Sequence, residues 1–375
     1  MKKIVLMPDS FKGTMSSSEI CAIMRDCIVA HFPKCEVISI PVADGGEGTV
    51  DCMLEAVGGE RVTLCVKGPF MEDIEGFYGI IDGGKTAVVE MAAAAGLPLA
   101  EERQDPRITT TYGVGQLMAD AVRRGCRKIV VGLGGSCTND MGVGAAAGAG
   151  ARFYDADGVE FIPTGGTLDR ISAIDVSALR TLFEGVSIVA MCDIDNPLYG
   201  ESGAAYVFAP QKGADGQTVQ LLDRNLRAGA AAVRHSLGVD VSAIAGAGAA
   251  GGMGAGMVAF FGAELKSGIR AVLDTVNFDS VAAGADVIFT GEGKIDSQSL
   301  RGKVVIGVAQ RAKELGVPVI AIVGDIGEGI EPAYDMGVSA IFSTNRVAVD
   351  FSRAKLRARS DMALTVDTAL RMLKL

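Results

Sequence analysis

The sequence predicts an α/β protein in which a doubly wound parallel sheet is interrupted by a second α/β domain. Short apolar runs of strand length alternate with stretches of helical periodicity at the N-terminus. The same alternation returns at the C-terminus, after a middle region with a different pattern. With 375 residues, 49% apolar side chains and 50 glycines, the chain can form two or three domains with packed cores.

The first four elements follow the order strand, helix, strand, helix. Residues 3–8 form an apolar run typical of a buried parallel strand. A capping box at Ser16–Glu19 opens a helix that is expected to run to about residue 30. The next strand is expected over 36–42, and the next helix over 48–57, where two glycines follow.

The C-terminal part repeats this order. Strands are expected over 285–289, 317–323 and 338–342, with helices over 304–315 and 361–373. Joined to the two N-terminal strands, these three would complete a single parallel sheet with helices on both faces.

The domain prediction follows from this split. Residues 1–69 and 285–375 are expected to form the outer domain, and residues 70–284 the inserted domain. The elements expected in the inserted domain are strands 74–81, 85–91, 128–133 and 186–191 and helices near 112–124 and 142–150.

An uncharged stretch over residues 243–263 superficially resembles a membrane span. It consists mostly of glycine and alanine, which are weakly apolar, so a glycine-rich loop leading into a buried helix is the favoured interpretation. The N-terminal apolar run is too short for a signal peptide. The eight cysteines include no C-x-x-C pair, which disfavours a zinc site and favours a reduced, cytoplasmic location.

The net charge of −10 restricts the partners. No long basic run is present, so neither nucleic acid nor a membrane is expected as a partner. An anionic substrate would have to be held by local lysines, arginines and backbone N–H groups.

Four loops after predicted strands combine acidic or amide side chains with glycine or other turn residues. Glycine lets the backbone approach an anion closely, and carboxylates beside a phosphate need a cation between them. The loops therefore predict phosphoryl chemistry with Mg²⁺. They lie at 44–49 (DGGEGT), 134–140 (GGSCTND), 192–198 (CDIDNPL) and 290–296 (TGEGKID).

The position of these loops strengthens the prediction. Asp9, Asp44 and Glu292 follow strands of the outer sheet, and the carboxyl edge of such a sheet is where ligands bind. Asp140 and Asp193 follow strands of the inserted domain, and a cleft between the domains is expected to bring both sets together.

Each loop also has a purely structural explanation. The acids at 44–49 could favour a helix dipole, and Asp193 with its neighbours could cap a helix. The glycines of 246–256 could serve close packing, and Lys12 could be a solvated turn residue. The functional interpretation is favoured for each loop because of its predicted place at a strand end.

Two other signals are rejected. Gly79–Thr86 matches the P-loop pattern G-x4-G-K-[ST], but a strand rather than a helix is expected after it, so a hairpin is predicted. His31 and His235 are both expected to be solvated, which disfavours histidine-based hydrolases, most zinc enzymes and histidine-dependent dehydrogenases. The catalytic chemistry that remains is a carboxylate acting as the base together with Mg²⁺.

As an ordered set, the segments resemble the type-1 bacterial glycerate kinase family. The resemblance implies a flavodoxin-like domain with a second domain inserted, and ATP-dependent phosphorylation of D-glycerate to 2-phosphoglycerate. The segments that carry it are 9–13 (DSFKG), 44–49, 134–140, 192–198, 248–254 (GAAGGMG) and 290–298 (TGEGKIDSQ).

Residue roles are hypothesised for that reaction. Asp193 is expected to accept the hydroxyl proton, with Asp44 or Asp296 as the next choices, and Lys12 and Lys294 to hold the glycerate carboxylate. Asp140 and Glu292 are expected to hold Mg²⁺. Further substrate contacts are expected from Asp9, Ser10, Glu47 and Gln298, and the phosphates of ATP are expected on Gly134, Gly135, Ser136, Thr138, Asn139, Gly251, Gly252 and Gly254.

Several alternatives stay open at this stage. The enzyme could be a glycerate 3-kinase or a kinase of a related small hydroxy acid, or the protein could be a non-catalytic regulator that binds a nucleotide or sugar acid. A dehydrogenase would be expected to carry G-x-G-x-x-G after its first strand, which residues 9–13 do not match. The domain that binds ATP and the choice between monomer and homodimer are not determined by the sequence.

Overall fold

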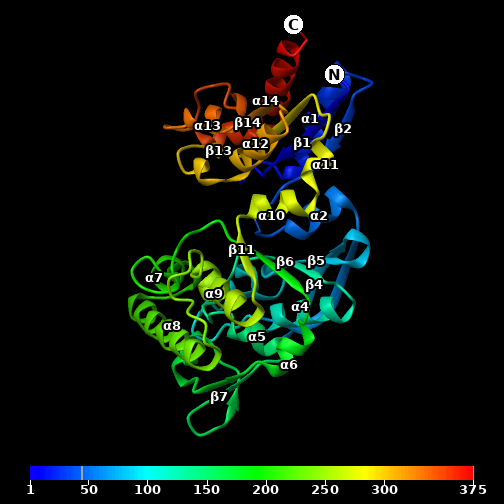
Figure 1. The fold of residues 1–375 in the computed structure, drawn as a ribbon. Coiled ribbons are helices and arrows are strands. Elements are labelled where there is room, and N and C mark those ends of the chain that lie inside the picture. The colour runs from blue at the N-terminus through cyan, green and yellow to red at the C-terminus, as the bar shows by residue number, and fades with distance from the viewer. Residues whose placement is uncertain (44, 375) are drawn as a thin grey trace. The chain divides into compact units, whose positions relative to one another are not determined.

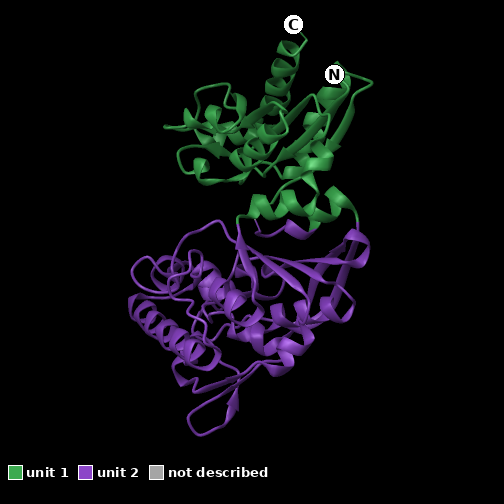
Figure 2. Cartoon of the chain, viewed as in Figure 1, with its two compact units in different colours: residues 1–44, 51–58, 267–375 green, residues 45–50, 59–266 purple. Residues whose placement is uncertain are grey.

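The computed structural model describes residues 1–43 and 45–374. The chain divides into two compact units: unit 1 comprises Met1–Asp44, Asp51–Gly58 and Ser267–Leu375, and unit 2 comprises Gly45–Val50 and Gly59–Lys266 (Figure 2). This division differs from the predicted ranges in three places. Residues 45–50 and 59–69 belong to unit 2, and residues 267–284 belong to unit 1.

Strand and helix contacts explain the shifted boundaries. Strand β3 (Glu60–Lys67), which the sequence did not predict, pairs antiparallel with β4 (Asp73–Ile81) of unit 2. Helices α10 (Gly268–Thr275) and α11 (Phe278–Ala282) pack against α12 (Val304–Glu314) of unit 1. Residues between 267 and 284 thus belong to the outer fold.

Unit 1 contains a five-stranded parallel sheet in the order β16-β14-β12-β1-β2. In chain order this is the 2-1-3-4-5 arrangement of flavodoxin-like folds, which confirms the predicted fold class. The strand order reverses between β1 and β12. The strands are β1 (Lys3–Pro8), β2 (Glu36–Ser39), β12 (Val287–Gly291), β14 (Val319–Val323) and β16 (Val338–Ser343).

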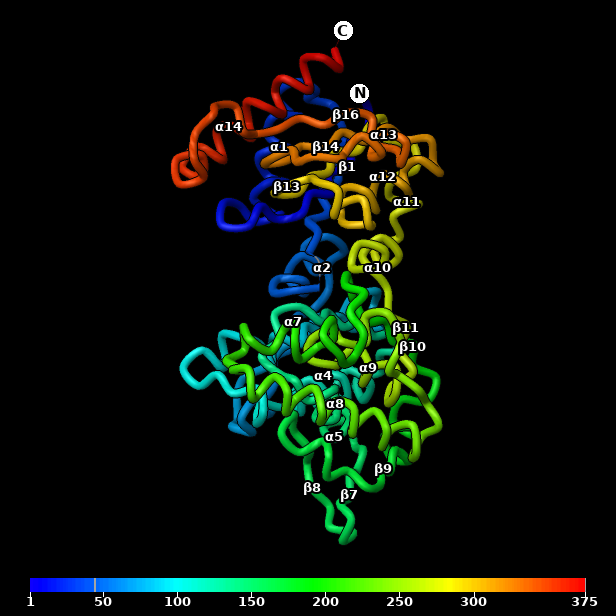
Figure 3. Tube along the Cα trace, turned by 90° about the vertical axis from the view of Figure 1, so that its left-hand side faces the viewer, coloured from blue at the N-terminus to red at the C-terminus, as the bar shows by residue number. Residues whose placement is uncertain are grey.

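Helices cover both faces of this sheet (Figure 1). Helix α1 (Ser17–His31) begins with the predicted capping box and packs beside α14 (Phe351–Met372), as Figure 3 also shows. The apolar residues of α1 and α14 form one buried cluster with residues of the strands. Among the described residues, none of α12 belongs to this cluster. The smaller elements of unit 1 are α2 (Thr49–Val57, which begins in unit 2), α13 (Pro332–Asp335), β13 (Lys294–Ile295), β15 (Asp325–Ile326) and the 3-10 turn Ser299–Arg301.

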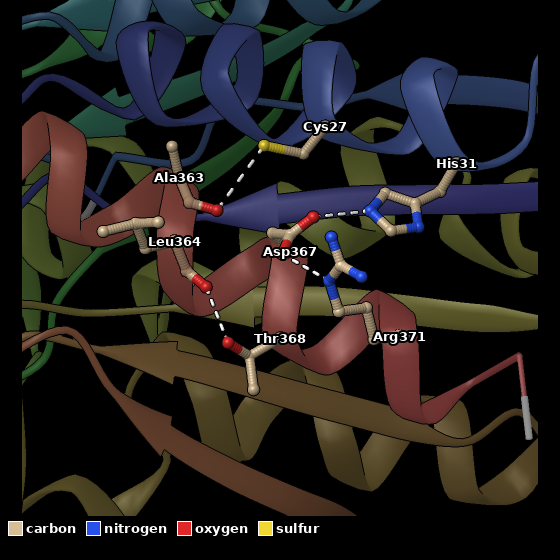
Figure 4. Close-up of polar contacts among 7 residues, drawn as sticks. All are labelled: Cys27, His31, Ala363, Leu364, Asp367, Thr368 and Arg371. Carbon is tan, nitrogen blue, oxygen red and sulfur yellow. Dashed lines mark hydrogen bonds and ion pairs between the residues drawn. The ribbon is translucent and has the colours of Figure 1, made fainter.

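One histidine differs from expectation. His31 Nε2 lies 2.6 Å from Asp367 Oδ1, and the other oxygen of this carboxylate accepts a hydrogen bond of 2.8 Å from Arg371 Nε (Figure 4). Only 12% of the His31 side chain is exposed, so the prediction that it is solvated is wrong. The pair joins α1 to α14, and the pKa of Asp367 is lowered by Arg371 and then by His31. This histidine thus has a structural partner on α14.

Unit 2 contains a six-stranded mixed sheet in the order β11-β10-β6-β5-β4-β3. The four strands β11, β10, β6 and β5 are parallel, whereas β4 and β3 run antiparallel to their neighbours. The 3-10 turn Asp82–Gly84 joins β4 to β5, so the predicted hairpin is confirmed and the P-loop is excluded. The remaining strands are β5 (Thr86–Glu90), β6 (Lys128–Gly132), β10 (Ser187–Met191) and β11 (Glu264–Lys266).

Helices and a small sheet complete unit 2. The uncharged stretch becomes a loop followed by the buried α9, as predicted, and no helix of the described chain is long and apolar enough to cross a membrane. The long α8 was not predicted. The helices are α3 (Ala92–Ala95), α4 (Tyr112–Arg123), α5 (Val143–Gly148), α6 (Ser177–Leu182), α7 (Ala204–Phe208), α8 (Gly216–Leu237) and α9 (Ala249–Phe261). The small sheet consists of β8 (Glu160–Phe161), β7 (Arg152–Tyr154) and β9 (Ala173–Asp175), and 3-10 turns lie at Leu97–Ala100, Gly165–Arg170 and Pro210–Lys212.

Candidate functional site

In unit 1, two acids stand where the strand order reverses. Asp9 follows β1 and Glu292 follows β12, and the Asp9 backbone N–H donates to the Gly291 carbonyl over 2.8 Å. Asp9 Oδ1 accepts a hydrogen bond of 2.6 Å from the Ser10 N–H. In open α/β sheets this crevice at the carboxyl ends of the strands is the ligand site.

Glu292 is the most perturbed acid of this edge. Its side chain is buried, with 6% of the residue exposed, and its Oε1 has no hydrogen-bond partner in the described part of the chain. Burial raises its pKa to about 7, an effect that Asp9 and Asp296 reinforce and that Ser299 and Lys303 oppose. Such an orphaned buried carboxylate oxygen is costly unless a ligand or cation completes it.

The loop after Glu292 supplies mixed charges. Lys294 Nζ lies 3.5 Å from Asp296 Oδ2, and Asp296 Oδ1 accepts a hydrogen bond of 3.0 Å from the Gln298 N–H. Partial burial opposes the lowering of the Asp296 pKa, but the Gln298 N–H and Lys294 lower it. Asp296 is therefore favoured as a carboxylate rather than as a neutral acid.

Lys12 belongs to the same edge. The side chains of Lys12 and Lys294 are both exposed. A Cβ placed on Gly293 would lie 3.7 Å from the Lys12 backbone nitrogen, so the loops after β1 and β12 are adjacent. The structure thus brings together seven predicted residues of unit 1: Asp9, Ser10, Lys12, Glu292, Lys294, Asp296 and Gln298.

In unit 2, the loop 45–50 is held on the edge formed by β5 and β6. The Glu90 carboxylate, which is buried, accepts hydrogen bonds from the Val50 N–H at 2.6 Å and from the Gly48 N–H at 3.3 Å. The Gly134 N–H donates to the Gly45 carbonyl over 2.9 Å. Sequence reasoning missed Glu90, although a glutamate that ends an otherwise apolar strand was a usable signal.

Two predicted residues lie in this loop. Glu47 is exposed, and its Oε1 would lie 3.7 Å from a Cβ placed on Gly135. Glu47 therefore faces the loop that follows β6. The predicted catalytic alternative Asp44 lies outside the described residues.

The loop 134–140 is buried on its inner side. Thr138 and Asn139 have no exposed surface, whereas Gly135 is exposed and Ser136 keeps 7% of its surface. The Thr109 hydroxyl donates to the Cys137 carbonyl over 3.1 Å and supports the loop from behind. Gly134 and Gly135 are therefore its accessible part, and the buried Ser136 follows them directly.

Asp140 supports the loop from within. One carboxylate oxygen accepts hydrogen bonds from the Thr111 N–H and hydroxyl, both at 2.8 Å, and the other accepts one of 3.1 Å from the Gly142 N–H. The residue has no exposed surface, and burial raises its pKa. A carboxylate enclosed in this way has a structural role in supporting the loop, and its predicted role as a Mg²⁺ ligand stays a prediction.

The glycines after residue 250 also pack against protein. A Cβ on Gly251 would lie 2.0 Å from the Thr138 carbonyl oxygen, and one on Gly254 would lie 2.2 Å from that of Gly246. Gly252 is likewise buried, and a Cβ on it would lie 3.0 Å from the Met141 Cα. These positions serve close packing, the alternative that the sequence left open, and their role as phosphate contacts stays a prediction.

One functional candidate was not predicted. Lys212 is 2% exposed, and its Nζ donates to Ser136 Oγ at 2.8 Å and to the Thr138 carbonyl at 2.6 Å. Burial lowers the pKa of this ammonium to about 8, while Cys137 and Asp140 act in the opposite direction. Its sequence context, PQKGAD, is that of an ordinary surface turn, so no local pattern could have identified it.

The loop after β10 carries the predicted base. Asp193 and Asp195 are exposed, and Asn196 Nδ2 donates to the Ser202 carbonyl over 2.8 Å. Burial raises the pKa of the adjacent Cys192 thiol. The amide thus fixes the loop and leaves two carboxylates at its surface.

The two predicted metal ligands belong to different units. Glu292 belongs to unit 1 and Asp140 to unit 2. Across the residues that the structure describes, no group of three or more His, Cys, Asp or Glu side chains is arranged to hold a metal ion.

Comparisons with known proteins agree with the fold. Residues 4–374 match the model of the glycerate kinase family. A glycerate kinase of Bacillus cereus is 43% identical over 364 residues, which are 97% of this chain and 96% of the relative. A glycerate 2-kinase of Escherichia coli K12 is 44% identical over 342 residues, or 91% of this chain and 90% of the relative.

A solved structure is similar as well. The crystal structure described as glycerate kinase 2 from Salmonella typhimurium LT2 matches with a TM-score of 0.88 and 39% identity, over 100% of this chain and 98% of that one. Together these similarities define an enzyme of the ATP-dependent kinase class. The chain belongs to the glycerate kinase family, which confirms the resemblance of its ordered segments.

Proposed function

We propose that this kinase transfers the γ-phosphoryl group of ATP to the 2-hydroxyl of D-glycerate and releases 2-phosphoglycerate. The family supports glycerate as the acceptor, and the relative named glycerate 2-kinase supports the position. The structural observation that carries the proposal is the set of acids and lysines at the strand-order reversal of unit 1, beside the buried Glu292. Phosphoryl transfer depends on positioning and charge neutralisation, which such a set provides.

The acceptor carboxylate is assigned to Lys12 and Lys294. Both ammonium groups are exposed on adjacent loops of the same sheet edge, and an ammonium can only donate hydrogen bonds. Ser10 and Gln298, which are also exposed, are assigned to the substrate hydroxyl groups, together with Asp9 and Glu47. A compact acid with two hydroxyl groups suits such a site.

The phosphates of ATP are assigned to Gly134, Gly135 and Ser136. No described residue accepts a hydrogen bond from the Gly135 or Ser136 N–H, and Gly135 has φ +73, so this turn presents backbone N–H groups to an anion. The net charge of −10 makes such local donors necessary.

The proton of the attacking hydroxyl is assigned to Asp193, with Asp296 as the next choice. Asp193 is exposed at the end of β10 on a loop that Asn196 fixes. Its task is to accept the 2-hydroxyl proton as the oxygen attacks the phosphorus atom. Asp44, which the sequence offered beside Asp296 as a next choice, keeps that place.

Mg²⁺ fits the oxygen donors near Glu292. The unpartnered Oε1 of Glu292, with Asp9 and Asp296 acting on it, offers the hard carboxylate ligands that the ion takes. Since Mg²⁺ is bound by one or two carboxylates together with phosphates and waters, a set of two or three acids suffices. When bound, the ion would neutralise charge on the transferred phosphate.

The test is a kinase assay with the purified chain, ATP, Mg²⁺ and a panel of D-glycerate, L-glycerate, glycolate and D-lactate. We expect ADP release only with D-glycerate, and loss of activity in EDTA. Enolase uses 2-phosphoglycerate directly, whereas the 3-isomer needs a mutase first, so coupling to enolase alone identifies the product. A signal that appears only after mutase is added would overturn phosphorylation at the 2-hydroxyl. If none of the acids in the panel causes ADP release, the proposed class of acceptor is wrong.

A further inference from the structure

Lys212 is a buried charge that the proposed reaction leaves unused. It lies in the turn Pro210–Lys212 with 2% of its surface exposed, and it forms no ion pair with any described residue. Its two hydrogen-bond partners, Ser136 and Thr138, are uncharged at the accepting atoms. A buried charge is expensive, and the nearby Asp140 acts on it without forming an ion pair, so its presence calls for an anion supplied by a ligand.

Hydrogen-bond direction makes the contact with Ser136 informative. An ammonium only donates, so Ser136 Oγ must accept the bond from Lys212. The hydroxyl proton of Ser136 is therefore free to point elsewhere, and no described residue accepts it. Ser136 follows the exposed Gly135, so this proton is available at the accessible end of the loop.

We propose that Lys212 is a positioning residue that orients and polarises the Ser136 hydroxyl toward an anionic oxygen of a substrate. The oxygen belongs either to a phosphate of ATP or to the carboxylate of the hydroxy acid. The proposal rests on the proposed phosphoryl transfer, and it adds one charged residue to the three loop positions assigned above. A hydrogen bond donated by a polarised hydroxyl to an anion is stronger than a neutral pair.

A purely structural role explains the arrangement less well. The loop is already supported by neutral donors, because Thr109 bonds the Cys137 carbonyl and Thr111 bonds Asp140. A neutral side chain could hold the Thr138 carbonyl in the same way without a buried charge. The charge itself is therefore what the site requires.

The test compares four variants: Lys212→Met, Ser136→Ala, the double variant and Thr109→Val. Thr109→Val is the matched control, since it removes one hydrogen bond to the same loop but no charge. We expect Lys212→Met and Ser136→Ala each to lower kcat/KM by about 10–100-fold, and the double variant to be no worse than the poorer single variant. The control should stay within about threefold of the wild type.

The kinetic constants identify the anion. A raised KM for ATP with an unchanged KM for the acid assigns the contact to a phosphate, and the reverse assigns it to the carboxylate. Multiplicative losses in the double variant, or two single variants as active as the control, would overturn the proposal. If Lys212→Met does not fold, Lys212→Gln takes its place in the same comparison with Ser136→Ala and Thr109→Val.

A binding measurement separates this proposal from the proposed function. Calorimetry with ADP and with D-glycerate, each without turnover, should show at least tenfold weaker binding of one ligand to Lys212→Met and Ser136→Ala, but not to Thr109→Val. If the wild type binds but phosphorylates no acid, the proposed reaction fails while the Lys212 contact can still hold. Equal binding of both ligands to all variants would refute the contact.

Discussion

The Nζ atom of Lys212 lies 2.6 Å from the carbonyl oxygen of Thr138, with both residues buried. This ammonium has its pKa lowered from 10.5 to about 8 by burial, and Cys137 and Asp140 are the ionisable groups that act on it. The contact therefore affects stability as well as the proposed catalysis.

The first prediction concerns the alkaline stability of Lys212→Met. Below pH 8 the folded chain carries the buried charge, and between about pH 8 and 10.5 the unfolded chain binds the proton more tightly than the folded one. As the pH rises through this window, the free energy of unfolding of the wild type should increase by about 3 kcal/mol relative to that of Lys212→Met. Urea unfolding of both proteins at pH 7.5 and pH 10.5 measures the change, and a constant difference would contradict it.

The second prediction concerns Glu292→Gln without Mg²⁺. Burial raises the pKa of Glu292 from 4.5 to about 7, so its favourable contribution is present below pH 4.5 and is lost as the pH rises through 7. The quantity to compare is the free energy of unfolding of Glu292→Gln minus that of the wild type, measured in EDTA. This difference should be up to about 3 kcal/mol more favourable to the variant at pH 8 than at pH 4.5. Glu328 is exposed, and Glu328→Gln, measured at the same two pH values, provides the control.

The same substitution should remove activity. A group that stabilises the transition state is expected to contribute a factor of about 10²–10³ to kcat, so Glu292→Gln should gain stability at pH 8 and lose turnover together. An active Glu292→Gln enzyme with normal dependence on Mg²⁺ would exclude Glu292 as a ligand of the ion.

The third prediction concerns the proposed base. Asp193→Asn should lower kcat by about 10²–10³ and remove the acidic limb of the pH–rate profile, because an amide cannot accept the hydroxyl proton. The neighbouring exposed Asp195→Asn provides the control and should keep most of the activity. Near-normal kcat with an unchanged profile in Asp193→Asn would transfer the role to Asp296.

The fourth prediction separates packing from backbone strain. Gly251 and Gly238 have similar positive φ values of +71 and +73, but a Cβ would meet the Thr138 carbonyl at 2.0 Å in the first and nothing within 4 Å in the second. Gly251→Ala should therefore cost roughly 2–5 kcal/mol, and Gly238→Ala only about 1 kcal/mol. Equal losses in thermal unfolding would show that close packing contributes nothing at Gly251.

Much of the fold could be predicted from local patterns. The strand Lys3–Pro8, the capping box at Ser16 and the hairpin at Asp82–Gly84 all arise from interactions within a few residues, and all three are present. Helix α8 and strand β3 were not predicted, although the buried residues Val219, Leu222 and Leu226 of α8 fall at helical spacing behind the N-cap Asp215.

The site was predictable only in part. Acid density after a strand located Asp9 and Glu292 correctly at a sheet edge, since topology alone determines that place. It could not reveal that Thr111, distant in sequence, encloses the carboxylate of Asp140. Nor could it reveal the burial of Lys212, because that depends on a loop formed 76 positions earlier.

The sheet order of unit 1 has a consequence for how the chain is made. Strand β1 is synthesised first, yet one of its two neighbours, β12, leaves the ribosome only after all of unit 2. One row of β1 hydrogen-bonding groups, from Ile4 to Pro8, has no partner strand during this interval. A nascent chain therefore exposes an apolar strand edge for most of its translation, and such an edge can pair with another chain.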